Sequence, residues 1–187
     1  MHSRINNETI NHIIKIPQNV LVEIEENLCT FKGPHGTILH KINKLISIKK
    51  NENTIILQTT IKKVDKRLKK NALINTTYAL FKNYINGVLN LFEKSLIIKG
   101  VGYKAEYKDL ILTLFLGYSH TINYKIPSDI KIEIITPTNI LIKGVSKHKV
   151  GQIAHEIKMK KPADAYKGNG IKYKDDITKL KSPKKTK

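Results

Sequence analysis

Hydrophobic and polar residues alternate in several short stretches of this chain, which is the pattern of a strand with one buried face. Ile130, Ile132 and Ile134 fall on one side of such a strand, whereas Lys131 and Glu133 fall on the other. Other stretches rich in β-forming residues cover 20–26, 45–50, 54–59 and 139–144. The pattern predicts antiparallel sheets with one face against a hydrophobic core.

The strand pattern repeats at an interval of 84 residues. Residues 28–57 align with residues 112–141 without a gap, and twelve of the thirty aligned positions are identical. The identical pairs are Leu28/Leu112, Phe31/Phe115, Gly33/Gly117, Thr37/Thr121, Ile38/Ile122, Lys41/Lys125, Ile42/Ile126, Ile46/Ile130, Ile48/Ile132, Thr54/Thr138, Ile56/Ile140 and Leu57/Leu141. Biased composition alone would give only a few matches, so the alignment predicts two copies of one structural unit.

A helical pattern follows the strands of the second half. Ser146 is a good N-cap residue, and Pro162 cannot continue a helix. The apolar residues between them form one stripe at helical spacing, which consists of Val150, Ile153, Ala154 and Ile157. We expect a helix that packs this stripe against the sheet.

The first half carries a corresponding helical pattern. Asp65 can cap this helix and Gly87 can end it. The residues expected to face inward include Leu68, Ala72 and Ala79. Each half therefore consists of several strands followed by one helix.

This order of elements predicts an α+β fold with two duplicated domains, each an antiparallel-rich sheet with one helix packed on a face. The expected segments are an N-terminal extension (1–14), a first α+β repeat (15–90), a second α+β repeat (91–174) and a basic C-terminal tail (175–187). Residues 161–174 carry too few apolar side chains for us to expect a core element there.

The net positive charge of the chain indicates what kind of partner it binds. The 34 Lys and Arg residues against 15 Asp and Glu residues give a formal net charge of +19, which predicts a polyanionic partner. Residues 143–174 mix lysine with tyrosine and glycine, a combination suited to contact with phosphates and bases. A membrane is the rival partner, but this segment lacks an apolar face that could insert into one. The sequence therefore favours a nucleic acid over a lipid surface.

Two glycine motifs resemble known ligand-binding motifs. Residues 100–105 match the G-x-G-x-x-A dinucleotide fingerprint, but a β-like segment follows them where that site requires a helix. Residues 33–36 match a G-x-x-G backbone clamp, but they lie between strands, so a hairpin turn is expected. Neither motif predicts a ligand site.

Catalytic and metal-binding chemistry have no residues to support them. The seven histidines are not accompanied by carboxylates or thiols at ligand spacing, and no nucleophile or phosphate-loop motif is present. Cys29 is the single cysteine, which excludes an intramolecular disulfide and fits a reducing compartment. We expect no enzyme activity, cofactor, metal or small-molecule substrate.

Arginine supplies only two of the basic residues, Arg4 and Arg67, and isoleucine and asparagine are abundant. This bias is typical of an AT-rich gene, in an organelle or in an AT-rich bacterium. The N-terminus resembles neither a secretory signal nor an Arg-rich presequence. We expect a location within an organelle, with a mitochondrion slightly favoured over a plastid, or otherwise in a bacterial cytoplasm.

Several segments resemble the large-subunit ribosomal protein six family of bacterial type. The stretch AYKGNGIKY (165–173) resembles the C-terminal signature of that family. Residues 96–120, which include KGVGYKA and LGYSH, and residues 140–158, which include IKGVSKHK, resemble its central motifs. Near the start, residues 15–38, with FKGPHG, also agree. The likeness covers most of the chain in order and includes the duplication.

The resemblance implies a structural constituent of the large ribosomal subunit, without catalytic activity, that binds large-subunit rRNA mainly through its second domain. It implies a location near the sarcin–ricin loop and the stalk base, with neighbouring ribosomal proteins in contact and translation factors nearby. The alternative from another class is a free RNA-binding accessory factor in rRNA maturation or ribosome assembly.

The same resemblance names candidate rRNA-binding residues by position. These are Tyr103, Lys104, Ser119, His120, Lys147, Lys149, Tyr166, Lys167, Gly168, Gly170 and Lys172, with Lys160 and Lys161 where the family has basic residues. The chain departs from the family at Asn169, where a lysine is typical, and at Ala163 and Ala165, near which proline is common. These departures predict a looser C-terminal loop with one weaker phosphate contact.

Overall fold

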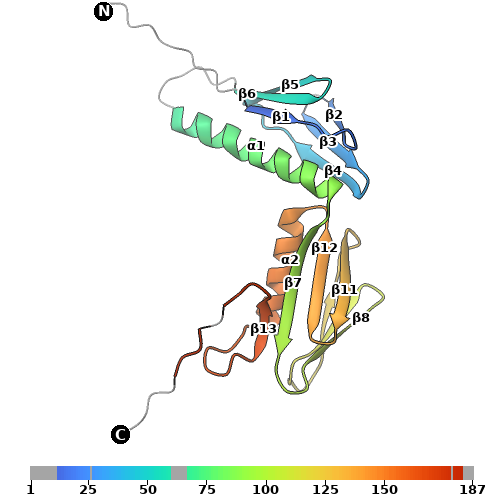
Figure 1. Cartoon of the computed structure of the whole chain (residues 1–187), viewed down its shortest axis with the longest axis vertical. Coiled ribbons are helices and arrows are strands. Elements are labelled where there is room, and N and C mark those ends of the chain that lie inside the picture. The colour runs from blue at the N-terminus through green and yellow to red at the C-terminus, as the bar shows by residue number, and fades with distance from the viewer. Residues whose placement is uncertain (1–11, 26, 60–66, 178, 183–187) are drawn as a thin grey trace, which may run out of the picture. The chain divides into compact units, whose positions relative to one another are not determined.

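The computed structural model describes residues 12–25, 27–59, 67–177 and 179–182. Asp65, expected to cap the first helix, lies outside this set. The chain divides into two compact units, residues 1–90 and 91–187 (Figure 1). Neither helix of the described segments is long and apolar enough to span a bilayer.

The first unit contains two three-stranded antiparallel sheets and one helix. One sheet has the order β1-β6-β5, formed by His12–Lys15, Thr54–Thr59 and Ile46–Asn51. The other has the order β2-β3-β4, formed by Leu21–Glu25, Leu28–Gly33 and Gly36–Lys41. Helix α1 (Arg67–Leu89) packs against strands of both sheets, so the core lies between the helix and the strands.

The buried face of α1 differs from the sequence prediction. Ala72 and Ala79 are exposed, and the helix continues through Gly87. The buried stripe is instead Ile74, Thr77, Phe81, Ile85 and Val88. These mostly larger side chains remove more apolar surface from water than alanines would, so they determine which face packs. The side chain of Leu68, the third residue expected to face inward, lies outside the described set.

Aromatic residues and a tight turn complete this core. The Phe31 and Phe81 rings meet edge to face with centroids 5.0 Å apart. The expected hairpin turn at residues 33–36 is confirmed, because Gly33 pairs with Gly36. A side chain at Gly33 would lie 2.7 Å from Cβ of Val88, so this position must be glycine for α1 to pack there. Cys29 is free and fully buried in the same sheet.

The second unit repeats this architecture with one strand added. One sheet has the order β10-β9-β8, formed by Ile122–Lys125, Ile111–Phe115 and Lys104–Lys108. The other has the order β11-β12-β7-β13, formed by Ile130–Thr136, Asn139–Gly144, Phe92–Lys99 and Gly170–Tyr173. Helix α2 (Lys147–Lys160) packs on β7, β12 and β13 (Figure 1). The α+β prediction is confirmed, with two sheets rather than one in each unit.

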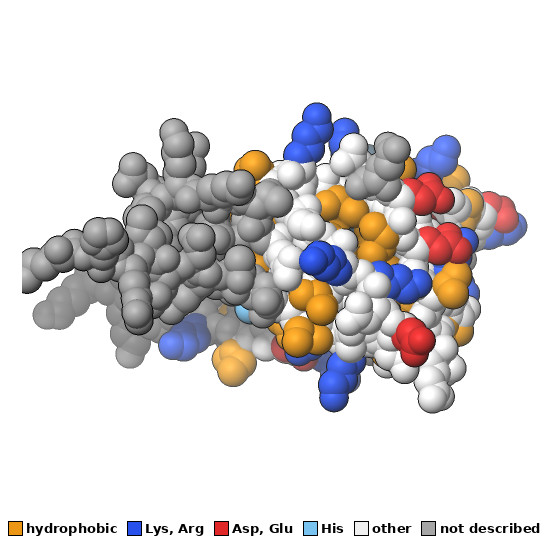
Figure 2. All heavy atoms as spheres, turned by 90° about the horizontal axis from the view of Figure 1, so that it is seen from above, with side chains coloured by type: hydrophobic (Ala, Val, Ile, Leu, Met, Phe, Trp, Pro, Cys, Tyr) orange, Lys and Arg blue, Asp and Glu red, His pale blue; other side chains and the backbone are white. Residues whose placement is uncertain are grey.

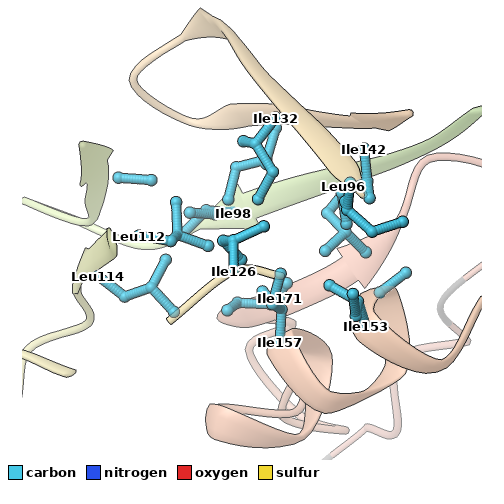
Figure 3. Packing of buried hydrophobic residues seen from close by; sticks show 14 of the residues in the cluster. Leu96, Ile98, Leu112, Leu114, Ile126, Ile132, Ile142, Ile153, Ile157 and Ile171 are labelled. Carbon is cyan, nitrogen blue, oxygen red and sulfur yellow. The ribbon is translucent and has the colours of Figure 1, made fainter. Parts of the chain in front are cut away.

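Helix α2 is the helix that the sequence predicted. Ser146 caps it, with its hydroxyl accepting from the backbone N–H of Lys149, and the buried residues are the four expected ones. The helix stops two residues before Pro162. Figure 3 shows Ile153 and Ile157 directed from the helix towards the strands of the sheet.

The expectation that residues 161–174 hold no core element is wrong. Ile171 is fully buried in the core cluster, where it lies close to Ile157 (Figure 3). The backbone of residues 170–173 pairs with β7 and supplies the fourth strand of the sheet. A single large apolar residue suffices here because the ladder hydrogen bonds come from the backbone, whatever the composition.

The gapless alignment of the two halves is correct in its centre and wrong at both ends. Phe31 pairs with Ile38, as Leu114 pairs with Ile122, so the counterpart of Phe31 is Leu114 and not Phe115. Leu57 pairs with Ile48 in the same way as Ile142 pairs with Ile132, so Leu57 corresponds to Ile142 rather than to Leu141. Each of these hairpins has gained one residue in the second unit. A shift of one residue moves every side chain to the other face, so the matches in β3 and β6 are not structurally equivalent.

Candidate nucleic-acid interface

Tyrosine rings and lysines from separate segments meet at the C-terminal end of α2. The ammonium of Lys161 lies 4.8 Å from the ring centroid of Tyr103 and 4.2 Å from that of Tyr118. It also donates a hydrogen bond of 2.5 Å to the carbonyl of Leu116. Its neighbour Lys160 is exposed, with its ammonium 5.7 Å from the Tyr124 ring. Two adjacent lysines therefore sit in different environments.

The turn between β7 and β8 explains the motif at residues 100–105. Gly102 adopts φ +73°, which favours glycine, and the ring of Tyr103 covers Gly100 and Gly117. A Cβ atom at Gly100 would lie 2.4 Å from that ring, and one at Gly117 would lie 2.8 Å from it. Strand β8 follows the turn, as expected, where a dinucleotide site would require a helix. Gly100 and Gly117 therefore leave room for the Tyr103 ring, whereas Gly102 permits the backbone conformation of the turn.

The loop from β9 to β10 presents further polar and aromatic groups. The rings of Tyr118 and His120 are stacked, with centroids 6.3 Å apart and planes 21° apart. The Tyr118 hydroxyl donates to the backbone carbonyl of Lys160 at 3.3 Å. Ser119 and His120 are exposed. This loop is thus attached to the end of α2 while its polar side chains face solvent.

The C-terminal loop is closed by its own hydrogen bonds. The Asp164 carboxylate accepts the backbone N–H of Lys167 at 2.9 Å, and the Asp164 backbone N–H donates to the Asn169 carbonyl at 2.9 Å. Hydrogen bonds from the backbone of Lys167, and then of Tyr166, lower the pKa of the Asp164 carboxyl. Tyr166 is 59% exposed, and Lys167 is exposed beside it. The loop therefore holds one aromatic and one cationic side chain in solvent.

Both glycines of this loop have an internal reason to be glycine. Gly168 has φ +71°, and a side chain there would lie 3.2 Å from Cδ2 of Leu180. Gly170 has φ +136°, and a side chain there would lie 2.5 Å from the carbonyl oxygen of Pro162. The sequence suggested that glycine brings backbone N–H groups close to phosphate. The Gly168 N–H instead donates to the Asp164 carbonyl, and RNA contact by either glycine stays a prediction.

The N-terminal end of α2 carries a separate pair of predicted residues. Lys147 is exposed with its ammonium 6.0 Å from the Phe92 ring, and Lys149 forms an ion pair of 2.6 Å with Asp129. Fourteen helical residues span ~20 Å at 1.5 Å per residue. Lys147 and Lys160 therefore lie about that distance apart, and the candidate residues form two groups along the helix.

The remaining predicted residues lie on strands. Lys104 forms an ion pair of 2.7 Å with Glu106 and lies 4.5 Å from the Phe115 ring centroid. Lys172 is half-buried on β13, where it pairs with Ile97 of β7. The carboxylates of Glu106 and Asp129 therefore offset the positive charge of Lys104 and Lys149 locally.

Two further lysines near this region, Lys99 and Lys158, are not among the candidate rRNA-binding residues that the sequence gives. Gly170 pairs with Lys99, and a methyl group built on Gly168 would lie 3.9 Å from Nζ of Lys99. Lys158 lies 4.4 Å from the Tyr173 ring and forms an ion pair of 2.7 Å with Asp176. Lys99 is far from the loop in sequence, and only the β7–β13 pairing brings it there.

Charge is mixed on other parts of the surface. On the face drawn in Figure 2, Lys and Arg side chains stand singly among hydrophobic and uncharged atoms, with acidic side chains near one edge. Among the described residues, no group of three His, Cys, Asp or Glu side chains could hold a metal ion. The chemistry available in the second unit is therefore that of cations, rings and hydrogen-bond donors.

Comparison with known proteins supplies a family. The family described as "Ribosomal protein L6" matches residues 16–90 and 99–174, one match in each unit. Similar proteins include "Large ribosomal subunit protein uL6" of Burkholderia mallei (strain SAVP1), Burkholderia ambifaria (strain MC40-6) and Burkholderia pseudomallei (strain K96243). Each is 39% identical over 168 residues, which cover 90% of this chain and 93% of the relative.

Proposed function

Because the chain belongs to the ribosomal protein L6 family, we propose that it is a structural constituent of the large ribosomal subunit that binds large-subunit rRNA through its second unit. Ribosomal protein L6 is a non-enzymatic structural protein, and family membership therefore confirms the expected lack of catalytic activity. The mechanism is recognition of folded RNA by shape and charge, with phosphate neutralisation by lysines.

The loop at residues 163–170 is the observation that carries the proposal. Its hydrogen bonds fix the backbone before any partner arrives, so little entropy is lost when Tyr166 and Lys167 meet RNA. The proposed interface comprises the loop, both ends of α2 and the neighbouring turns, with Tyr103, Lys104, Ser119, His120, Lys147, Lys149, Lys160, Lys161, Tyr166, Lys167, Gly168, Gly170 and Lys172.

The position within the subunit is also part of the proposal. The family resemblance supports a site near the sarcin–ricin loop and the stalk base, where translation factors dock. The first unit serves in this proposal as a spacer and as a surface for neighbouring ribosomal proteins. A cryo-EM map of the purified large subunit tests the position, and a second unit that faces open solvent there would contradict it.

The organellar origin rests on composition alone. Two arginines among 34 basic residues are typical of an AT-rich gene, and we propose an organellar ribosome on that ground. Fractionation followed by mass spectrometry of mitochondrial, plastid and cytoplasmic ribosomes assigns the compartment. Recovery in cytoplasmic ribosomes alone would overturn this part of the proposal.

The rRNA contact is tested by the salt dependence of binding. The triple variant Lys147→Ala, Lys149→Ala and Lys167→Ala removes three proposed phosphate contacts, and each lost contact lowers the slope of log K against log salt by roughly 0.7–0.9. The control, Lys15→Ala, Lys41→Ala and Lys44→Ala, removes the same charge from exposed positions of the first unit. Equal slopes for the two variants would contradict the assignment.

A salt wash separates the subunit protein from an accessory factor. A structural constituent is retained stoichiometrically on large subunits after washing at high salt. A free factor that acts only during assembly is lost in the wash, so its loss would favour that alternative.

A further inference from the structure

We infer that Lys161 is a positioning residue of this interface, which holds the β9–β10 loop and the Tyr103 turn in place and does not itself neutralise a phosphate. The inference rests on the proposed rRNA binding and assigns one of its lysines a different role. It follows from the contacts of the side chain and of the backbone of the same residue.

The Lys161 ammonium is already occupied within the protein. It is half-buried, donates to the Leu116 carbonyl at 2.5 Å, and lies within 5 Å of the ring centroids of Tyr103 and Tyr118. A phosphate contact would have to replace this hydrogen bond and at least one favourable cation–π contact. Lys160 is less constrained, because its side chain is exposed and its ammonium lies 5.7 Å from the ring centroid of Tyr124.

The backbone of Lys161 adds two further connections. Its N–H donates to the Lys158 carbonyl at 3.3 Å at the end of α2, and its carbonyl accepts from the Ile171 N–H at 2.8 Å. One residue therefore ties α2 and β13 to the two turns that carry the aromatic rings. Loss of the side chain frees the turns while the backbone connections remain.

The Tyr118 side chain is the element on which Lys161 acts most directly. Tyr118 is stacked with His120 and donates to the Lys160 carbonyl, so its position determines where the loop presents Ser119 and His120. Without the Lys161 ammonium, the hydrogen bond of 3.3 Å from the Tyr118 hydroxyl to the Lys160 carbonyl still joins this ring to α2. The loop is then held less firmly at the end of the helix.

The test measures rRNA binding of the full-length protein as a function of salt. Lys161→Ala is expected to weaken binding about tenfold, the size of one or two partly buried cation–π contacts, with an unchanged slope of log K against log salt. The matched control Lys160→Ala removes the adjacent exposed lysine and is expected to lower the slope by roughly 0.7–0.9. A lower slope for Lys161→Ala would show a direct phosphate contact and overturn the inference.

A double-mutant cycle tests whether Lys161 acts through Tyr118. If it does, Tyr118→Ala combined with Lys161→Ala weakens binding no more than the stronger single variant. Additive losses would overturn the inference, as would unchanged binding by Lys161→Ala. Circular dichroism and thermal unfolding establish that each variant is folded. Lys161→Arg keeps a cation between the rings and is expected to recover most of the affinity. Wild-type protein that does not bind rRNA would refute the proposed function itself, whatever the variants do.

Discussion

The two units share a strand order and differ in the segments that connect and extend the strands. The order β5-β6-β1 of the first unit corresponds to β11-β12-β7 of the second, and β2-β3-β4 corresponds to β8-β9-β10. The second unit adds β13 at the free edge of β7, and it replaces the tight turn at residues 33–36 by a loop with one more residue. Most candidate RNA-binding residues lie on or beside these differences. The two units therefore share a core, and the proposed binding residues lie mostly on or beside the segments that differ.

The separation of core and binding surface predicts that RNA affinity divides unequally between the units. A fragment of residues 91–187 is expected to bind large-subunit rRNA within a few-fold of the full chain. A fragment of residues 1–90 is expected to bind roughly a thousandfold more weakly, at the level of non-specific binding. Filter binding or fluorescence anisotropy at a fixed salt concentration measures both, after circular dichroism has shown that each fragment folds. Strong binding by residues 1–90 would reverse the comparison.

The added strand is expected to be an integral part of the second core. Ile171→Ala removes a fully buried side chain, and we expect the free energy of unfolding to fall by about 3 kcal/mol. Ile177→Ala is the matched control, because Ile177 is 91% exposed and its loss should change stability by less than about 0.5 kcal/mol. Urea denaturation measures both values. Equal effects would mean that β13 is only loosely attached to the sheet.

Alanine substitutions at two glycines of the second unit are expected to change its stability in opposite directions. Gly170→Ala forces a side chain towards the Pro162 carbonyl at φ +136° and is expected to cost about 2–3 kcal/mol. Gly151→Ala lies on the exposed side of α2 with nothing within 4 Å, and is expected to stabilise by about 0.5–1 kcal/mol. Thermal unfolding of the two variants gives the signs. Stabilisation by Gly170→Ala would contradict the close approach of β13 to residues 162–163.

The smallest expected effect concerns the carboxylate that closes the C-terminal loop. The Asp164 pKa is lower in the folded than in the unfolded protein, so its stabilising contribution is present above the unfolded value of about 3.9 and is lost as pH falls through the folded value. The difference in unfolding free energy between wild type and Asp164→Ala should therefore be present at neutral pH and vanish in strong acid. Glu52→Ala, in the turn between β5 and β6, serves as the control. A difference that grows towards low pH would be inconsistent with this assignment.

The sequence was sufficient for elements in which local pattern and tertiary packing agree. Strands β6 and β12 begin and end at the predicted residues, and α2 has the predicted cap and buried stripe. In α1, the sequence pattern predicts that alanines face inward, although longer side chains on another stripe bury more apolar surface. The pattern of a helix surface does not by itself say which of two stripes the sheet will cover.

The candidate site was less predictable, because its contacts join segments distant in sequence. Nothing local to Lys99 indicates that β13 will pair beside it, and nothing local to Lys161 indicates two tyrosines from other turns. The single inserted residues in the second unit were also hidden, because isoleucine-rich strands align almost as well one position out of register. Charge and family motifs predict a surface, but the role of each lysine depends on its three-dimensional neighbours.

The buried thiol of Cys29 provides a way to measure transient opening of the first unit separately from the second. Cys29 is the single cysteine of the chain, and burial raises the pKa of its thiol to about 12. The thiolate is the form of cysteine that attacks a thiol reagent, so labelling must wait until the β2-β3-β4 sheet opens. The labelling rate therefore reports transient opening of the first unit, and the second unit contributes no sulfhydryl to the signal. A fluorophore can accordingly be attached through a new cysteine at the Tyr166 loop while the native one stays silent.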